Sequence, residues 1–279
     1  MSLYRMQSCR HGNLLYNSVD NFVGKSLALY GEWSEPECFL FNQIIKAGDT
    51  VIEAGANIGS HTVMLSKAVG ERGSVLAFEP QRHVFQLLCA NLALNERFNV
   101  HAFHKAVGSS PGKIYFPVVN PAEPNNFGAV SVFTSGHDTE ATSIVSLDSL
   151  ELTRLDFLKA DVEGFELNVI DGARKAIEKY RPIVYLEYLN HYTGDNTSTL
   201  FNWFAPLDYR LWFYITPLFN NENFLGNGEN TFTGIWSFDM VCIPKERGEI
   251  RGLTEANGMN SGYCDNPTAW REVRYLPPY

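Results

Sequence analysis

The middle of the chain shows an order of apolar and polar positions that is typical of strands alternating with helices. Short apolar runs of strand length are each followed by a longer helical segment or a connecting loop. The predicted strands cover residues 50–55, 74–80, 99–108, 155–164, 182–189, 209–216 and 236–244. The predicted helices of this region cover residues 60–70, 82–95, 165–180 and about 197–206. This order predicts an α/β fold with a doubly wound, mostly parallel, seven-stranded Rossmann-like sheet.

The segments around this pattern predict additions to the sheet. Weak alternation over residues 13–30 indicates a hairpin, and Ser34 and Glu37 are spaced as a capping box before a helix over 37–46. Residues 109–146 are rich in proline, asparagine and glycine, which indicates an insertion of loops and short strands in place of a crossover helix. We therefore expect three parts. They are a hairpin-and-helix extension (1–48), a main domain (49–244) that contains the insertion (109–146), and a turn-rich tail (245–279).

Composition narrows the class of protein. The 279 residues are 45% hydrophobic and 19% charged, which predicts a packed core. Lys and Arg number 22 against 31 Asp and Glu, and there is no basic run, so we expect a small or neutral substrate and no nucleic acid. No window approaches 18 apolar residues, so we expect no membrane association. The sequence does not indicate an oligomeric state.

The cysteines indicate a compartment. Five are scattered through the chain without a C-x-x-C motif, and no apolar signal peptide opens the sequence. Both observations favour reduced thiols and a cytoplasmic location. Cys89 and Cys242 lie in apolar runs, and we expect both in the core.

The stretch VIEAGANIGSHTV (51–63) carries the first chemical signal. Glu53 ends a predicted strand, Gly55 and Gly59 bracket the following turn, and a helix begins directly afterwards. Such a helix N-terminus offers free N–H groups and the positive end of a dipole. The third glycine of the dinucleotide fingerprint and the Gly-Lys-Ser/Thr ending of a P-loop are both missing. A tight turn without a ligand is the alternative interpretation.

A second acidic residue favours a ligand site over a turn without a ligand. Glu79 ends the next predicted strand, 79 − 55 = 24 residues beyond Gly55. In doubly wound folds an acidic residue at this place binds both hydroxyls of a ribose. Glu53 would repel a pyrophosphate but could bind an ammonium group. Together the two acids favour S-adenosylmethionine, which has an amino acid at one end, a ribose at the other and no phosphate.

Several motifs resemble the FkbM-type family of S-adenosylmethionine-dependent methyltransferases. They are VIEAGANIGSHTVML, AFEPQ, KAVG, SLDSLELTRLDFLKADVEGFELNVIDGA and RPIVYLEY, which lie in this order over roughly residues 50–190. The resemblance implies that residues 49–244 form a methyltransferase domain. It suggests O-methylation of a hydroxyl on a sugar or polyketide-type acceptor. Its motifs imply cofactor contacts from Glu53, Gly55, Asn57, Gly59, Ser60, Glu79, Ala106 and Asp161. The family often has aspartate at the position of Glu53.

The acceptor side of the reaction has its own candidates. Glu53, Glu79, Asp161 and Glu187 all fall near carboxyl ends of predicted strands, where open α/β sheets bind ligands. The candidate catalytic bases are Asp161, Glu163, Glu187 and His191, and His61 is a weaker one that could merely cap a helix. Trp33 and Tyr192 are candidates for acceptor contacts.

A metal-assisted mechanism is the alternative to a simple base. Asp161, Glu163 and Glu187 could bind Mg²⁺ or Ca²⁺, but their spacing does not require an ion. We therefore favour a site without a metal.

Other functions remain open at this stage. An N- or C-methyltransferase would bind S-adenosylmethionine through the same residues. A non-catalytic module that only binds S-adenosylmethionine is a further alternative. The complete set of Glu53, Gly55, Gly59, Glu79 and the Asp161–Glu163 pair argues against the module. The missing third glycine argues against an oxidoreductase.

Overall fold

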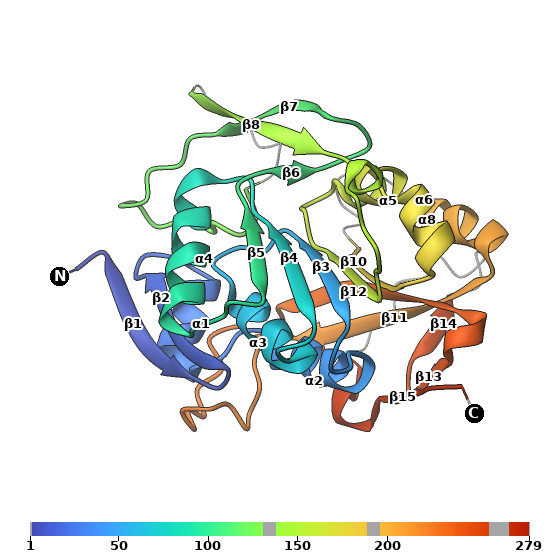
Figure 1. Ribbon diagram of the computed structural model, residues 1–279. Coiled ribbons are helices and arrows are strands. Elements are labelled where there is room, and N and C mark those ends of the chain that lie inside the picture. Colours follow the sequence, from blue (N-terminus) through green and yellow to red (C-terminus); the bar gives the residue numbers. More distant parts are fainter. Residues whose placement is uncertain (1, 131–137, 189–195, 257–267, 279) are drawn as a thin grey trace.

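An eight-stranded sheet forms the centre of the protein in a computed structural model, which describes residues 2–130, 138–188, 196–256 and 268–278 (Figure 1). The seven predicted strands are all present in it, and a short eighth strand is added at one edge. From edge to edge the strands are β14 (Thr254–Ala256), β11 (Tyr209–Pro217), β12 (Trp236–Pro244), β10 (Ile183–Glu187), β9 (Phe157–Ala160), β3 (Thr50–Ala54), β4 (Ser74–Phe78) and β5 (Val100–Phe103). Strands β10, β9, β3, β4 and β5 run parallel, whereas β12, β11 and β14 pair antiparallel.

Helices cover both faces of this sheet (Figure 1). Side chains alternate along each strand, so Ile52 and Leu158 pack on one face and Val51 and Phe157 on the other. The α-helices are α1 (Val23–Tyr30), α2 (Glu35–Ile44), α3 (Ser60–Val69), α4 (Arg82–Leu94), α5 (Glu166–Asp171), α6 (Arg174–Tyr180) and α8 (Asn196–Phe204). The first face is covered by α5, α6 and α8, and the second by α2, α3 and α4, as a doubly wound fold requires.

The strand order predicts a binding site at the carboxyl ends of the parallel strands. Strand β3 is central, and the chain adds β4 and β5 on one side before it returns to add β9 and β10 on the other. Neighbouring connections therefore diverge at the carboxyl ends of β3 and β9. Such a topological switch point opens a crevice that ligands use.

The insertion forms a small sheet of its own beside the main one (Figure 1). This sheet contains β6 (Ala106–Val107), which directly precedes the insertion, then β8 (Thr139–Val145) and β7 (Gly112–Pro117), in that order. The predicted strand 99–108 is thus divided, because β5 pairs with the main sheet and β6 with β8. Asn21 N–H donates to the carbonyl of Asn125, which ties the insertion to the N-terminal extension.

The prediction of a hairpin over residues 13–30 is wrong. The hairpin lies earlier, with β1 (Tyr4–Cys9) paired to β2 (Gly12–Asn17), and residues 23–30 form α1. Both carboxylate oxygens of Asp20 accept hydrogen bonds from the backbone N–H groups of Phe22 and Gly24, which cap the start of this helix. The spacing of Val23, Leu27 and Tyr30, all buried, is the helical signal that the strand interpretation missed.

Two helix boundaries also differ from expectation. Helix α2 begins at Glu35 and ends at Ile44, and Ser34 has a left-handed backbone with its hydroxyl bonded to the Glu37 carboxylate rather than to a backbone N–H, so no capping box forms. The predicted helix 165–180 is divided into α5 and α6 near Gly172. A Cβ at Gly172 would lie 2.0 Å from the carbonyl oxygen of Gly108, so the chain passes too closely there for a regular helix of larger residues.

The C-terminal segment has more structure than its turn-rich composition indicates. Besides β14 it contains β13 (Glu249–Arg251), which pairs with β15 (Arg274–Leu276).

Short 3-10 helices lie at Leu147–Ser149, Ala205–Leu207, Lys245–Arg247 and Trp270–Glu272. Cys242 is buried as expected, but Cys89 is exposed because it faces away from the sheet on α4. Within the described ranges, none of the helices has both the length and the apolar character that crossing a membrane requires.

Candidate active site

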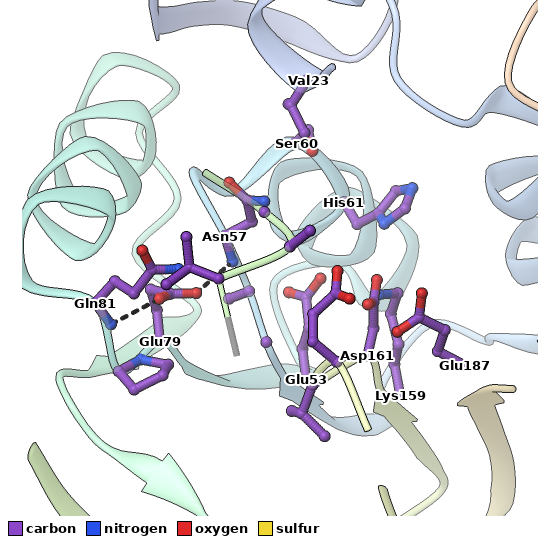
Figure 2. Close-up of a pocket in the computed structure, with 18 of the residues that line it drawn as sticks. Val23, Glu53, Asn57, Ser60, His61, Glu79, Gln81, Lys159, Asp161 and Glu187 are labelled. Atoms are coloured by element: carbon purple, nitrogen blue, oxygen red, sulfur yellow. Dashed lines mark hydrogen bonds and ion pairs between the residues drawn. The ribbon is translucent and has the colours of Figure 1, made fainter. Parts of the chain in front are cut away.

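A cavity of about 280 Å³ opens at the carboxyl ends of the parallel strands (Figure 2). Its floor consists of residues at or just after the carboxyl ends of β3, β4, β9 and β10. Three added segments contribute residues to its walls. They are the N-terminal extension (Phe22, Val23, Trp33 and Glu37), the insertion (among others Asn126, Gly128, Ala129 and Val130), and the connection from β11 into the start of β12 (Leu218, Ile235, Trp236 and Ser237). A cavity of this size and position suits a ligand of cofactor dimensions.

The glycine turn after β3 is shaped by the backbone next to it. Gly55 has a φ of +83°, and a Cβ there would lie 1.8 Å from the carbonyl oxygen of Asp161. Glycine is therefore required at this position for two reasons, which are the left-handed conformation and the close approach of the chain after β9. Asn57 also has a positive φ (+51°), which its side chain supports by accepting a hydrogen bond from the Ile58 N–H at 2.7 Å.

The close approach at Gly55 leads to a stability prediction. Gly55→Ala should lower the free energy of unfolding by about 3–5 kcal/mol, because the left-handed strain is added to a backbone clash. Gly48→Ala is the matched control: its φ is +92°, and a Cβ there meets nothing within 4 Å. It should cost only about 1–2 kcal/mol. Urea unfolding of both variants measures the difference, and equal costs would contradict the clash.

Glu79 lines the cavity and is held in place by two backbone hydrogen bonds. It is 4% exposed, and its two carboxylate oxygens accept hydrogen bonds from the backbone N–H groups of Asn57 (3.0 Å) and Gln81 (2.8 Å) (Figure 2). These bonds join the glycine turn after β3 to the loop after β4. Each carboxylate oxygen has a further lone pair, so Glu79 can still accept two hydroxyl groups from a ligand.

A buried ion-pair network forms the middle of the floor. Lys159 is 0% exposed, and its Nζ lies 2.8 Å from Oδ2 of Asp161. In the parallel register Lys159 is paired with Glu53 of β3, whose Oε2 accepts a hydrogen bond from the Thr62 hydroxyl at 2.6 Å. Burial opposes the lysine charge, but the carboxylates of Asp161, Glu37 and Glu53 outweigh it and raise the pKa of Lys159 above its usual value. Lys159 is therefore a permanent cation among several acids.

Burial has the opposite effect on the acids themselves. It raises the pKa of Glu53, Glu79 and Glu37 to about 7 each, against an ordinary value of 4.5, although hydrogen bonds or the charge of Lys159 oppose the change. These carboxyl groups therefore take up protons near neutral pH. A positively charged ligand in the cavity would favour their ionised forms.

The raised pKa of Glu53 predicts a pH dependence of stability in the ligand-free protein. Because the folded-state pKa of about 7 exceeds the unfolded value of 4.5, the contribution of Glu53 is complete below pH 4.5 and is lost as the pH rises through about 7. The shift of about 2.5 units corresponds to about 3 kcal/mol. Glu53→Gln imitates the protonated form. Between pH 5 and pH 8, urea unfolding should show that the free energy of unfolding falls by about 3 kcal/mol less in this variant than in the wild type. Parallel pH curves for the two proteins would contradict the assignment.

The loop after β9 brings three further acids together. Oxygen atoms of Asp161, Glu163 and Glu187 all lie within 4.8 Å of one another. Glu166 shapes this loop, since its Oε1 accepts hydrogen bonds from the N–H groups of Val162 (3.0 Å) and Gly164 (3.2 Å). Burial, followed by repulsion from Asp161 and Glu166, raises the pKa of Glu163 to about 8. Burial and the charges of Asp161 and Glu163 also raise that of Glu187.

Most of the residues proposed from the sequence converge on this cavity. Those that line it are Trp33, Glu53, Gly55, Asn57, Ser60, Glu79, Ala106, Asp161, Glu163 and Glu187. Gly59 is not one of them; a Cβ there would lie 2.7 Å from Cδ1 of Leu88, so this glycine allows the packing of α4. His191 and Tyr192 lie outside the described residues.

Sequence reasoning missed several residues of the cavity. Lys159 and Glu37 are buried there, and His61, taken as a weak candidate, is only 5% exposed. Gln81 also lines the cavity, and its amide donates to the carbonyl of Phe127 at 2.9 Å, which holds the insertion above the turn. The signal for Lys159 was present, since a lysine inside the apolar strand FLKA must find a buried partner.

Comparisons with known proteins find similarity over the part of the chain that contains most of the cavity. Residues 53–211, more than half of the chain, match the family described as methyltransferase FkbM domain. Methyltransferase SdnD of Sordaria araneosa is 31% identical over 154 residues, which are 44% of this chain and 59% of that protein. Hexuronic acid methyltransferase AglP of Haloferax volcanii is 31% identical over 142 residues, which are 49% of this chain and 54% of that protein.

The matched regions thus span between a half and two thirds of these curated relatives. Among solved structures, the methyltransferase FkbM from Methylobacillus flagellatus KT aligns with a TM-score of 0.47 at 16% identity, covering 74% of this chain and 50% of that one. The family match over residues 53–211 includes the glycine turn, Glu79 and the loop after β9. The chain belongs to the FkbM methyltransferase family.

Proposed function

We propose that this protein transfers a methyl group from S-adenosylmethionine to a hydroxyl oxygen of a sugar or polyketide-type acceptor. The observation that carries the proposal is the pair of buried acids, Glu53 and Glu79, on the two sides of the glycine turn. They suit an ammonium group and a ribose, and they are unsuited to a pyrophosphate. Among the described residues, Lys105 and Lys159 are the cationic side chains that line the cavity, and Lys159 is already bonded to Asp161.

The proposed cofactor contacts follow the floor of the cavity. Glu79 accepts the two ribose hydroxyls, and Glu53 receives the ammonium group. Gly55, Asn57, Ser60 and Ala106 surround the remainder, with Gly59 shaping the turn from behind. Helix α3 begins at Ser60, so its free N–H groups face a site for the cofactor's carboxylate.

The acids at the ends of β9 and β10 form the proposed acceptor side. When bound, S-adenosylmethionine supplies an activated methyl group, so the chain's own residues chiefly align the acceptor. The acceptor oxygen forms a bond to the methyl carbon, the carbon–sulfur bond breaks with its electrons remaining on sulfur, and the hydroxyl proton passes to a base. Asp161, Glu163 and Glu187 are the candidates within the described residues, and His191 is a further candidate outside them. Trp33 contributes a wall of the acceptor side, and Tyr192 stays a sequence-based proposal.

Relatives support the acceptor class. AglP is named for hexuronic acid, a sugar derivative. By analogy we propose a glycan or other small hydroxylated molecule as the partner of this chain. N- or C-methylation uses the same cofactor half and is the alternative.

Transfer of a labelled methyl group tests the proposal. Wild-type protein, S-adenosylmethionine and a panel of hydroxylated glycans and macrolide precursors should yield a methyl ether, identified by mass spectrometry, together with S-adenosylhomocysteine. Methylation at nitrogen or carbon would favour the alternative. Tight binding of S-adenosylhomocysteine without transfer to any panel member would favour a non-catalytic module.

A further inference from the structure

The acceptor side of the cavity gathers more carboxyl groups than the described residues there supply cations for. Asp161, Glu163 and Glu187 converge within 4.8 Å, and Lys159 is paired with the first of them at 2.8 Å. Within the described part of the chain, neither Glu163 nor Glu187 has a salt bridge. Asp239, which is 3% exposed, lies opposite Glu187 in the register of β10 and β12 and adds another acid.

Two independent observations indicate that a ligand satisfies this excess. Oε2 of Glu187 is shut off from solvent and lacks a hydrogen-bond partner among the described residues, which is costly for a carboxylate oxygen. In addition, Trp33 and Trp236 line the same cavity. Acids combined with aromatic faces are the surroundings that bind an organic ammonium group, because the rings attract cations as well.

The charges disfavour the two other kinds of ligand. A carboxylate-bearing acceptor would meet like charges, since Lys105 follows β5 in the cofactor half and Lys159 is 0% exposed and already paired. A divalent metal on the three acids would lie close to the Lys159 ammonium, which is 2.8 Å from one of the ligand oxygens. A single positive charge on a compact group with several N–H donors can bind Glu163 and Glu187, and Lys159 repels it less than it repels a divalent ion.

We propose that the acceptor carries an ammonium group, as in an amino sugar or an amine-bearing natural product, and that Glu163 and Glu187 bind it beside the hydroxyl to be methylated. This inference rests on the proposed function and narrows its substrate class. It also separates this chain from an acceptor such as the hexuronic acid in the name of AglP.

Binding of such a cation should be coupled to proton release. Burial and neighbouring acids raise the pKa of Glu163 to about 8, so much of this group is protonated at pH 7 in the ligand-free protein. A bound ammonium favours the ionised form. Calorimetry at pH 7 in buffers of different ionisation enthalpy should therefore detect proton release on binding of the amine and not on binding of a neutral sugar.

Three sugars of matched size and different charge test the proposal. Protein saturated with S-adenosylhomocysteine is titrated with D-glucosamine, D-glucose and D-glucuronate at constant ionic strength. Glucosamine should bind at least about tenfold more tightly than glucose, since hydrogen bonds to charged groups exceed neutral ones, and glucuronate should bind most weakly. Glu187→Gln and Glu163→Gln should each reduce the affinity for glucosamine to about that for glucose. Glu178→Gln, which removes a surface charge on α6, should not change it.

The alternative outcomes each overturn the proposal. They are equal affinities for the three sugars, a preference for glucuronate, no binding of glucosamine, or a glucosamine preference that survives in both glutamine variants. Binding of Mg²⁺ or Ca²⁺ alone that is lost in Glu187→Gln would replace the ammonium group with a metal. The affinity for S-adenosylhomocysteine is measured in every variant. If the wild type does not bind S-adenosylhomocysteine, the proposed function itself is contradicted. If it binds S-adenosylhomocysteine but shows no preference for glucosamine, only the proposal about the acceptor charge fails.

Discussion

Replacement of Glu79 by alanine should weaken binding of S-adenosylhomocysteine about 10²–10⁴-fold, because two hydrogen bonds from ribose hydroxyls to a charged acceptor contribute about 1.5–3 kcal/mol each. The same change removes the acceptors of the Asn57 and Gln81 N–H groups, so the glycine turn also loses its connection to the loop after β4. Isothermal titration calorimetry of wild type and variant measures the loss.

A control separates the site from a general effect of charge. Glu71→Ala removes an exposed carboxylate after α3 and should leave the affinity unchanged. Equal affinities in wild type and Glu79→Ala would remove Glu79 from the binding site.

The second large effect is expected at the loop after β9. If an acid there accepts the hydroxyl proton, Asp161→Asn or Glu163→Gln should lower turnover about 10²–10⁴-fold while binding of S-adenosylhomocysteine is nearly unchanged. Turnover is measured with and without a chelator, and circular dichroism confirms folding, since Asp161→Asn leaves Lys159 without its nearest partner. Full activity in both variants would move the search for a base to Glu187 and His191.

The chelator distinguishes the two mechanisms in the wild type. We expect activity to persist in its presence, because the proposed site uses carboxylates and the ammonium of Lys159 rather than an ion. Activity that is lost to the chelator and restored by Mg²⁺ or Ca²⁺ would show instead that the three acids hold a metal.

The parts of the fold that the sequence predicted are those with strong local patterns. Each strand of the parallel sheet is mostly apolar, and the two glycines after β3 indicate a tight turn from the local sequence alone. The close approach of Asp161 to Gly55 depends on a distant segment and is visible only in the structure. Strand β14 has three residues in a polar segment, and it exists because β11 offers an edge to pair with. Such an element depends on a distant partner, so no local pattern reveals it.

The site was predictable where chemistry follows a motif and unpredictable where it depends on packing. Glu53, Glu79 and Asp161 were found because they end strands. Glu37 was assigned to a capping box from its spacing to Ser34, whereas α2 packs against the sheet and turns this carboxylate into the cavity. The position of Lys159 inside an apolar strand indicates a buried cation, but its partners become known only from the register beside Glu53 and the contact with Asp161.

Calorimetric titration of the wild-type protein with S-adenosylhomocysteine, with NAD and ADP titrated alongside, tests the central claim most directly. The two acids beside the glycine turn predict binding of one S-adenosylhomocysteine per chain and no binding of NAD or ADP, whose phosphates Glu53 would repel. Binding of NAD or ADP in its place, or no binding of S-adenosylhomocysteine, would contradict the account.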